Sequence, residues 1–211
     1  IKRGIYKAVS TILTQVTVDP YDESSYTPMK VVGRVMNAEE AKEEEAKGNF
    51  VVKEGDGYRR IVAAPKPVAI VEIDAIRALA DADQPVIAAG GGGIPVMEQG
   101  SHLKGASAVI EKDRAAGLLA KELDADVLMF ITGVPNVVLN YGSDHPINID
   151  KMTTADAARY AGEGHFKTGS MLPKVESSID FINAGKGRRA IITSLDGAKS
   201  ALAGKGGTTI Q

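Results

Sequence analysis

Four consecutive glycines, Gly90, Gly91, Gly92 and Gly93, constrain this chain more than any other feature of its sequence. They follow the apolar run Val86–Ala89, whose continuous rather than alternating pattern predicts a strand buried on both faces. Because glycine has no Cβ, the backbone can adopt positive φ there and a bulky group can approach it closely. An ordinary flexible turn is the alternative interpretation, but one turn seldom needs four glycines. At the carboxyl end of a parallel sheet, a strand that opens into such a loop is typical of phosphate-binding α/β proteins, so we predict an anion-binding loop.

The composition limits the partners of the chain. Its 211 residues, of which 44% are hydrophobic, suit one domain with a substantial core. Twenty-five basic and twenty-seven acidic residues give a net charge of −2, which argues against a nucleic-acid groove or a membrane-attracted surface. No apolar run approaches the ~20 residues that span a bilayer, and the lack of cysteine excludes disulfides and fits a cytoplasmic location. We therefore expect neither nucleic acid nor a membrane as a partner.

The order of predicted elements indicates the fold class. Ala8–Val18 is dense in β-branched residues and predicts a central strand. From residue 59 onward, short apolar strands alternate with amphipathic helices. The expected strands are Arg59–Ala63, Val127–Ile131, Ala190–Thr193 and Thr208–Ile210, and the expected helices are Ile70–Asp81, Lys112–Leu123, one capped by Thr153 that runs to Glu163, Pro173–Ala184 and one that ends near Leu202. This alternation predicts an α/β fold with a mainly parallel central sheet and helices on both faces.

Residues 19–60 interrupt this pattern. Asn37, with Glu40 three residues later, forms a predicted capping box. The helix that it opens is acidic and has almost no apolar face, so it should be exposed to solvent. The turn Gly55–Asp56–Gly57 then predicts a small hairpin. We therefore expect an α/β core made of residues 1–18 and 61–211, from which residues 19–60 protrude as a small α+β flap.

Several catalytic motifs are absent from the sequence. It contains no G-x-x-x-x-G-K-[ST] phosphate loop, no G-x-G-x-x-G that opens a helix, no G-x-S-x-G nucleophile elbow and no H-E-x-x-H metal motif. The three histidines, His102, His145 and His165, lie far apart in mixed polar settings, which disfavours a metal site.

What is left is a set of lysines at the ends of predicted elements: Lys66 between two prolines, Lys112 beside Asp113 at one helix start, and Lys174 at another. Lysine is usually solvated, and a helix start disfavours cations because the helix dipole is already positive there. Two lysines at helix starts are therefore unfavourable unless an anion binds beside them, and phosphate groups would supply that anion. Phosphoryl transfer needs charge neutralisation and in-line positioning more than covalent chemistry from the protein. A site of lysines and glycines without a histidine base suits an acceptor that is already anionic, such as a carboxylate or carbamate oxygen.

Short motifs spread over almost the whole chain carry a family resemblance. They are Pro65–Lys66–Pro67, Ala89–Pro95, Ala108–Asp113, Asn140–Tyr141–Gly142, Gly164–Phe166, Gly169–Met171, Pro173–Val175, Ile191–Ser194 and Gly207–Thr208. In this order they resemble carbamate kinase, a member of the amino acid kinase superfamily. The resemblance implies a three-layer α/β sandwich, a homodimer and a place in cytoplasmic arginine metabolism. It also implies reversible phosphoryl transfer between ATP and carbamate with Mg²⁺, usually run from carbamoyl phosphate and ADP toward ATP.

The resemblance further implies roles for single residues. Lys66 would reach the transferred phosphoryl group from the base of the flap. Lys112 and Lys174 would brace the phosphates of ATP, and Asp113 would orient these lysines. The glycine loop would lie near the nucleotide phosphates. The residues that would line the nucleoside pocket are Thr132, Gly133, Val134, Tyr141 and Met171.

The sequence departs from the family pattern in three places. Gly133 stands where the family often has aspartate, and Glu111 replaces the usual aspartate before Lys112. Neither change removes a charge that we regard as catalytic. Nothing in the sequence matches the family's amino-terminal segment, with its first strand and a further glycine-rich phosphate loop. We expect this part to exist physically, and an intact mass near 22.1 kDa without a companion peptide would refute that expectation.

Two alternative functions stay open at this point. Another superfamily member, acting on acetylglutamate, aspartate or UMP, would share the fold, but residues 19–60 and Pro65–Lys66–Pro67 favour carbamate. A non-catalytic nucleotide-binding remnant would bind ADP without any phosphoryl exchange.

Overall fold

The computed structural model describes Gly4 and residues 6–211, and the chain divides into two compact units, residues 1–112 (unit 1) and 113–211 (unit 2). Residues 1–3 and 5, at the start of the predicted core, lie outside the described part of the chain. The division falls after Lys112 and not at the ends of residues 19–60. The organisation expected from the sequence, a single core from which residues 19–60 protrude, therefore stays a prediction. Among the residues so described, no helix is both long and apolar enough to cross a membrane.

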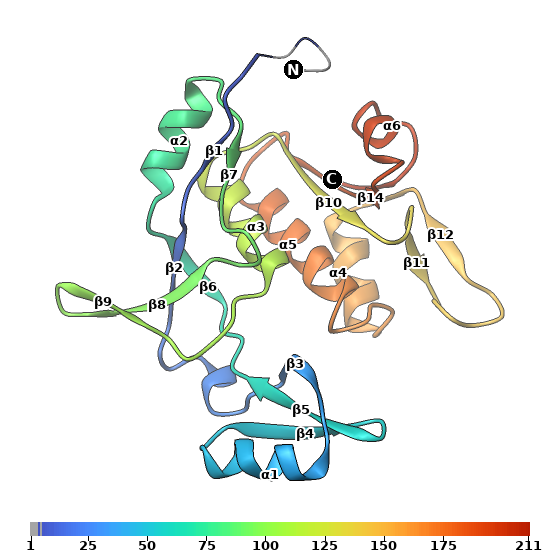
Figure 1. Cartoon of the computed structure of the whole chain (residues 1–211). Helices are drawn as coiled ribbons and strands as arrows, with labels where there is room; N and C mark the ends of the chain where they lie inside the picture. The colour runs from blue at the N-terminus through green and yellow to red at the C-terminus, as the bar shows by residue number, and fades with distance from the viewer. Residues whose placement is uncertain (1–3, 5) are drawn as a thin grey trace. The chain divides into compact units, whose positions relative to one another are not determined.

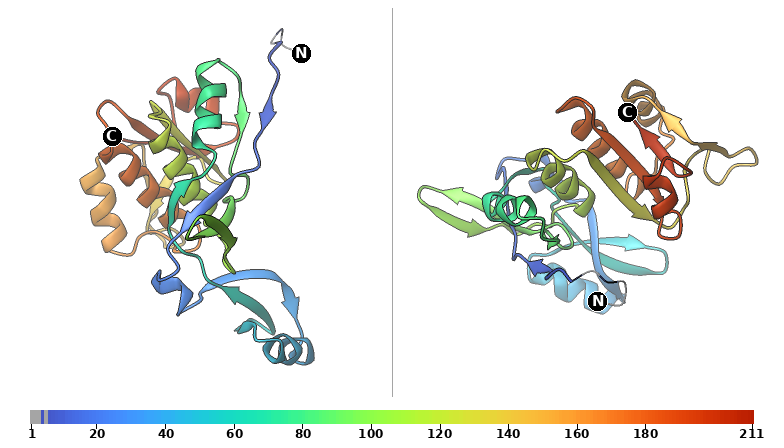
Figure 2. Two further views of the ribbon diagram at one scale, coloured as in Figure 1. Left: turned by 90° about the vertical axis from the view of Figure 1, so that its left-hand side faces the viewer. Right: turned by 90° about the horizontal axis from the view of Figure 1, so that it is seen from above.

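Unit 1 is built mainly from short strands (Figure 1). The strands are β1 (Ser10–Thr11), β2 (Gln15–Val18), β3 (Lys30–Met36), β4 (Phe50–Glu54), β5 (Gly57–Val62), β6 (Pro67–Ile70), β7 (Val86–Ile87), β8 (Ile94–Gln99) and β9 (His102–Gly105). The helical elements are the 3-10 turn η1 (Glu23–Ser25), α1 (Ala38–Ala46) and α2 (Ile73–Asp81). One sheet has the order β6–β2–β8–β9, in which β2 and β8 run parallel and the outer pairs are antiparallel. The turn end of the β8–β9 hairpin projects beyond the other strands of this sheet (Figures 1 and 2).

The predicted continuous strand Ala8–Val18 is wrong, because the strand is interrupted. β1 pairs in parallel with β7, whereas β2 pairs in parallel with β8. The glycine loop separates β7 from β8, so the first segment must change its partner opposite the loop. Thr14 lies at this change, and its hydroxyl donates a hydrogen bond to the Ile12 carbonyl over 2.9 Å. A side-chain hydrogen bond to the local backbone thus takes the place of strand pairing.

The prediction that Val86–Ala89 is buried on both faces is also wrong. Ile87 is 54% exposed, and within the described chain β7 pairs with β1 alone. A continuous apolar run did not distinguish a strand with two neighbours from a strand with one.

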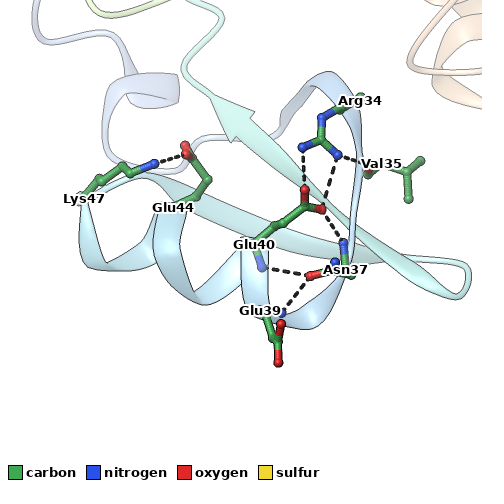
Figure 3. Close-up of polar contacts among 7 residues, drawn as sticks. All are labelled: Arg34, Val35, Asn37, Glu39, Glu40, Glu44 and Lys47. Atoms are coloured by element: carbon green, nitrogen blue, oxygen red, sulfur yellow. Dashed lines mark hydrogen bonds and ion pairs between the residues drawn. The ribbon is translucent and has the colours of Figure 1, made fainter.

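Residues 19–60 supply most of an antiparallel sheet of order β3–β5–β4, in which β5 continues to Val62, and α1 contacts β4 and β5. The Asn37 side chain accepts hydrogen bonds from two N–H groups in the first turn of α1, and the Glu40 carboxylate accepts one from the Asn37 N–H (Figure 3). This reciprocal arrangement confirms the predicted capping box. Arg34 donates to the same carboxylate over 2.5 and 3.2 Å, and together with the Asn37 N–H it holds the pKa of Glu40 below its ordinary value. Ala41 is the one buried residue of α1, so the polar helix is exposed as predicted.

Unit 2 contains helices and strands in alternation. Its helices are α3 (Lys112–Glu122), which begins at the last residue of unit 1, α4 (Thr154–Gly162), α5 (Met171–Asn183) and α6 (Ala198–Leu202). Its strands are β10 (Val127–Thr132), β11 (Val137–Leu139), β12 (Ile147–Ile149), β13 (Lys151–Met152), β14 (Arg189–Ser194) and β15 (Thr208–Ile210). The larger sheet has the order β10–β14–β15–β13, and β11 and β12 form a separate hairpin. The predicted cap of α4 is confirmed, because the Thr153 hydroxyl accepts a hydrogen bond from the Asp156 N–H over 3.1 Å.

The centre of unit 2 is β14, whose central residues have no exposed surface. Ala190 and Ile192 belong to a hydrophobic cluster with Val175 and Phe181 of α5. Ile191 is equally buried and, by the alternation of a strand, points to the opposite face. Since α5 and α6 both contact β14, the strand is covered by helices as the alternating pattern predicted.

The predicted α/β class is confirmed, with strand pairing that is more mixed than the predicted mainly parallel sheet. The pairs β1–β7, β2–β8, β10–β14 and β13–β15 are parallel, and the pairs β2–β6, β3–β5, β4–β5, β8–β9, β11–β12 and β14–β15 are antiparallel. Strands joined by tight turns can pair only in antiparallel fashion, as at the confirmed β4–β5 hairpin around Gly55–Asp56–Gly57.

Candidate functional site

Close packing requires glycine at the last two positions of the glycine loop. Gly92 has a φ of +139°, and a Cβ on it would lie 2.1 Å from the carbonyl oxygen of Ile110. Gly93 has a φ of +85°, and a Cβ there would lie 2.4 Å from Cγ2 of Val16. A side chain at either position would strain the backbone and collide with neighbouring atoms. These two glycines therefore have a structural explanation.

The first two residues of the loop face open space. A Cβ on Gly90 or Gly91 would meet no atom within 4 Å, and both residues line a cavity of about 500 Å³ in unit 1. Residues 11–14 and Ala108–Ile110 also line this cavity. Within the described chain, the N–H of Gly91 donates no hydrogen bond to the protein. An unpaired N–H beside a cavity suits an anion, so phosphate binding by this loop stays a prediction that concerns Gly90 and Gly91 above all.

The conformation of the loop depends on Thr14, which sequence reasoning did not single out. The Ala89 N–H donates to the Thr14 hydroxyl over 2.8 Å, and the Ile94 N–H donates to the Thr14 carbonyl over 2.9 Å. One residue thus holds both ends of the glycine loop, and it is only 4% exposed. No local pattern marks Thr14 among the other β-branched residues of its segment.

Lys66 lies between β5 and β6, and its side chain is exposed. Its N–H donates to the Asp22 carboxylate over 3.1 Å. Partial burial raises the pKa of Asp22, but hydrogen bonds from Ser24 and from the Lys66 N–H outweigh that effect and leave the pKa below its ordinary value. Pro65 is fully buried, so the backbone that enters Lys66 is anchored while the side chain reaches solvent.

Two of the predicted site residues form an ion pair in the interior of unit 2, here called the buried pair. Nζ of Lys174 donates to the Asp113 carboxylate over 2.7 Å, and the two side chains are 8% and 7% exposed. Asp113 lies in the first turn of α3, which begins at the exposed Lys112 as predicted. Lys174 lies in the first turn of α5, and its Nζ also donates to the Ser170 carbonyl over 3.3 Å. A cation is thus held at a helix N-terminus by a carboxylate from the neighbouring helix.

The buried pair depends on the close approach of α3 and α5. A Cβ on Gly117 would lie 2.8 Å from Cβ of Ser177, one turn farther along both helices. Glycine inside a helix costs about 0.5–1 kcal/mol relative to alanine, and this contact explains its presence. Arg114 and Glu176 form a second ion pair between the same helices at 2.6 Å, with side chains 26% and 37% exposed. The two helices are therefore joined by one buried and one partly exposed ion pair.

A second cavity, of about 720 Å³, lies within unit 2. All the residues predicted for the nucleoside pocket line it, namely Thr132, Gly133, Val134, Tyr141 and Met171. Its other lining residues, which sequence reasoning did not assign to it, are Asn136, Val138, Gly164, His165, Lys167 and Ser170. Lys167 is cationic and no residue of this lining is acidic, so the cavity suits an anionic ligand. Ser170 connects the cavity with the buried pair, because its carbonyl accepts the hydrogen bond from Lys174.

Polar side chains tie one wall of this cavity to the sheet. Nδ2 of Asn136 donates to the Gly207 carbonyl over 2.9 Å, to Asp150 over 3.2 Å and to the Ile149 carbonyl over 3.3 Å. The Thr208 hydroxyl accepts a backbone N–H of β11 over 2.7 Å. Gly207 lies 71 residues from Asn136, so no local signal could have revealed this role.

The described residues contain no group of three or more histidine, aspartate or glutamate side chains placed to hold a metal ion.

Comparisons with known proteins define the family. Residues 28–194 match the model of the amino acid kinase family, and the chain belongs to this family. It is 48% identical over 212 residues to the carbamate kinase-like protein YqeA of Escherichia coli (strain K12), and the match covers 100% of this chain and 68% of that protein. It is 47% identical to the carbamate kinase of Clostridium perfringens (strain 13 / Type A), with the same coverage. Among solved structures, the carbamate kinase from Giardia lamblia bound to AMP-PNP matches with a TM-score of 0.91 and 38% identity, over 99% of this chain and 67% of that one. The resemblance and the fold expected from the sequence are confirmed.

Proposed function

We propose that this protein is a carbamate kinase, which transfers a phosphoryl group reversibly between ATP and carbamate. The observation that carries the proposal is the similarity of the whole chain to carbamate kinases, with 47% identity to the enzyme of Clostridium perfringens. The Giardia lamblia carbamate kinase binds AMP-PNP, an ATP analogue, which supports ATP and ADP as the nucleotides here.

The cavity of unit 2 is our proposed nucleoside pocket. Its volume of about 720 Å³ lies within the range of small-molecule sites, and its lining combines apolar surface with a lysine and no carboxylate. Tyr141 and Met171 would supply apolar contact with the base, and Thr132, Gly133 and Val134 would form the wall that follows β10.

The phosphate groups are the proposed ligands of the lysines and the glycine loop. Lys174, which Asp113 holds at the start of α5, would present an ammonium group where the helix dipole also favours an anion. Lys66 and Lys112 would add positive charge, and the glycine loop would add backbone N–H groups. Mg²⁺, when bound through phosphate oxygens, would neutralise further charge.

In the direction of ATP synthesis, an oxygen of the ADP β-phosphate attacks the phosphorus of carbamoyl phosphate. The bond between that phosphorus and the carbamoyl oxygen breaks, and carbamate leaves as an anion. Because the leaving group needs no proton, a site without a histidine base is sufficient, and charge neutralisation by lysine carries the catalysis.

Other parts of the proposal concern the whole protein. We propose a homodimer that acts in cytoplasmic arginine metabolism, and a flap made of residues 19–60. Light scattering on the purified protein measures the oligomeric state, and a monomeric mass would contradict the dimer.

A coupled assay tests the proposed reaction. The protein should form ATP from ADP and carbamoyl phosphate in the presence of Mg²⁺, and should form none from acetyl phosphate. Lys174→Met should abolish this turnover, whereas the matched control Glu176→Gln, on the same helix, should retain it. ADP binding by calorimetry without phosphoryl exchange would overturn the proposal in favour of a non-catalytic nucleotide-binding protein.

A further inference from the structure

The structure assigns to Asn136 the choice of the nucleotide base: we infer that this residue selects a purine with an amino group at carbon 6. The inference rests on the proposed function, because it concerns the same nucleoside cavity. Asn136 lines that cavity and is half-buried. It adds a specificity-determining residue to the five that the sequence predicted for this pocket.

The orientation of the Asn136 amide is fixed by its partners. Its Nδ2 is surrounded by the carbonyl oxygens of Gly207 and Ile149 and by a carboxylate oxygen of Asp150, at 2.9 to 3.3 Å. An amide nitrogen has two donors and no acceptor, whereas an amide oxygen only accepts. The opposite orientation would place the oxygen against three acceptors, so these partners determine which end of the amide is which.

What remains for a ligand is therefore an acceptor. Within the described chain, Oδ1 of Asn136 accepts no hydrogen bond from the protein. The hydroxyls of Thr132, Ser170 and Tyr141 can donate or accept, and Lys167 can only donate. The imidazole of His165, which also lines the cavity, has one donor and one acceptor nitrogen when neutral. Among the uncharged polar side chains of the lining, Asn136 is thus the one whose remaining atom can only accept.

The bases differ in the group that Oδ1 would meet. Adenine carries an amino group at carbon 6, which donates, whereas guanine and hypoxanthine carry an oxygen there, which accepts. A buried site that is built to pair with a donor rejects a ligand that lacks one, because its own acceptor is left without a partner. The cavity should therefore prefer adenine nucleotides to 6-oxopurine nucleotides.

A purely structural role for Asn136 is the competing explanation, since its donors also tie the cavity wall to the sheet. Thr208 provides the matched control. It anchors the same wall through a backbone N–H of β11 and through the Ile149 carbonyl, but it does not line the cavity. Loss of an anchor should weaken all nucleotides alike, whereas loss of the acceptor should change the ratio between them.

Calorimetric titration of the purified protein with ADP, IDP and purine riboside 5′-diphosphate tests the inference. Purine riboside differs from adenosine only by lacking the amino group. The wild type should bind its diphosphate about tenfold more weakly than ADP, and IDP at least as weakly. Asn136→Ala should bring the three affinities close together, and Thr208→Val should keep the wild-type ratio.

The outcomes are distinguishable. Equal affinities of the wild type for the three nucleotides would overturn the inference. This test needs no variant, so it can be made even if the Asn136→Ala protein does not fold. An unchanged ratio in a folded Asn136→Ala protein would also overturn it, while leaving the proposed kinase function intact. Failure of the wild type to bind any of the three would overturn the proposed function and this inference together.

Discussion

Removal of the negative charge of Asp113 should cost far more stability than removal of that of Glu176, although both carboxylates bridge the same two helices. In Asp113→Asn the Lys174 ammonium loses its counter-charge at a side chain that is only 8% exposed. Breaking a buried ion pair on one side costs about 3–5 kcal/mol. The Arg114–Glu176 pair is partly exposed, with side chains 26% and 37% exposed, so water screens it and Glu176→Gln should cost about 0–1 kcal/mol.

Urea denaturation followed by far-ultraviolet circular dichroism measures the free energy of unfolding of both variants. Added salt should diminish the effect of Glu176→Gln and leave that of Asp113→Asn, because screening acts on exposed charges. The double variant Asp113→Asn with Lys174→Met should recover part of the loss, since it leaves no unpaired charge in the interior. Equal losses in the two single variants, or a loss in Asp113→Asn that salt removes, would refute the reasoning.

Three further predictions concern backbone geometry and pH. Gly92→Ala should lower the free energy of unfolding by about 3 kcal/mol or more, because Gly92 has a φ of +139° and a Cβ there would lie 2.1 Å from a backbone oxygen. Gly91→Ala should change the free energy of unfolding by less than about 1 kcal/mol and should weaken ADP binding. Equal denaturation midpoints of the two variants would contradict this prediction. Thr14→Val should cost about 1–3 kcal/mol because it leaves a loop N–H unpaired, and Thr14→Ser should retain the wild-type stability in the same titration. Hydrogen bonds accepted by Glu40 and Asp156 hold the pKa of each below its ordinary value, so their stabilisation is present above the unfolded-state pKa and is lost as pH falls through the folded-state pKa. Thermal midpoints should therefore drop below about pH 4, less steeply in a variant with both residues replaced by amides, and a midpoint that is flat into acid would contradict the assignment.

Features whose partners lie close in the sequence were predictable. The capping boxes at Asn37 and Thr153 each involve a partner three residues away, so the local pattern determined both. The helix that begins at Lys112 and the strand Thr208–Ile210 were likewise found where the sequence predicted them. The interruption of Ala8–Val18 was not predictable, because it depends on where the two halves find partners far along the chain.

The candidate site divides in the same way. The resemblance supplied the residues of the nucleoside pocket, and the structure brings them together around one cavity. The local sequence did not reveal that Gly92 and Gly93 are required by packing while Gly90 and Gly91 are open, since the atoms that decide this belong to other segments. Asn136 was missed for the same reason, because its three acceptors lie between 13 and 71 residues away.

The exchange of partners at Thr14 bears on the order in which unit 1 can fold. The hydrogen bond from the Ala89 N–H to this residue spans 75 positions of the chain. Closing so long a segment costs chain entropy before any contact compensates for it, so pairings of this kind form slowly. The glycine loop should therefore become ordered only once both flanking strands have docked, and the Ala89 amide proton should be among the last to gain protection from exchange during refolding.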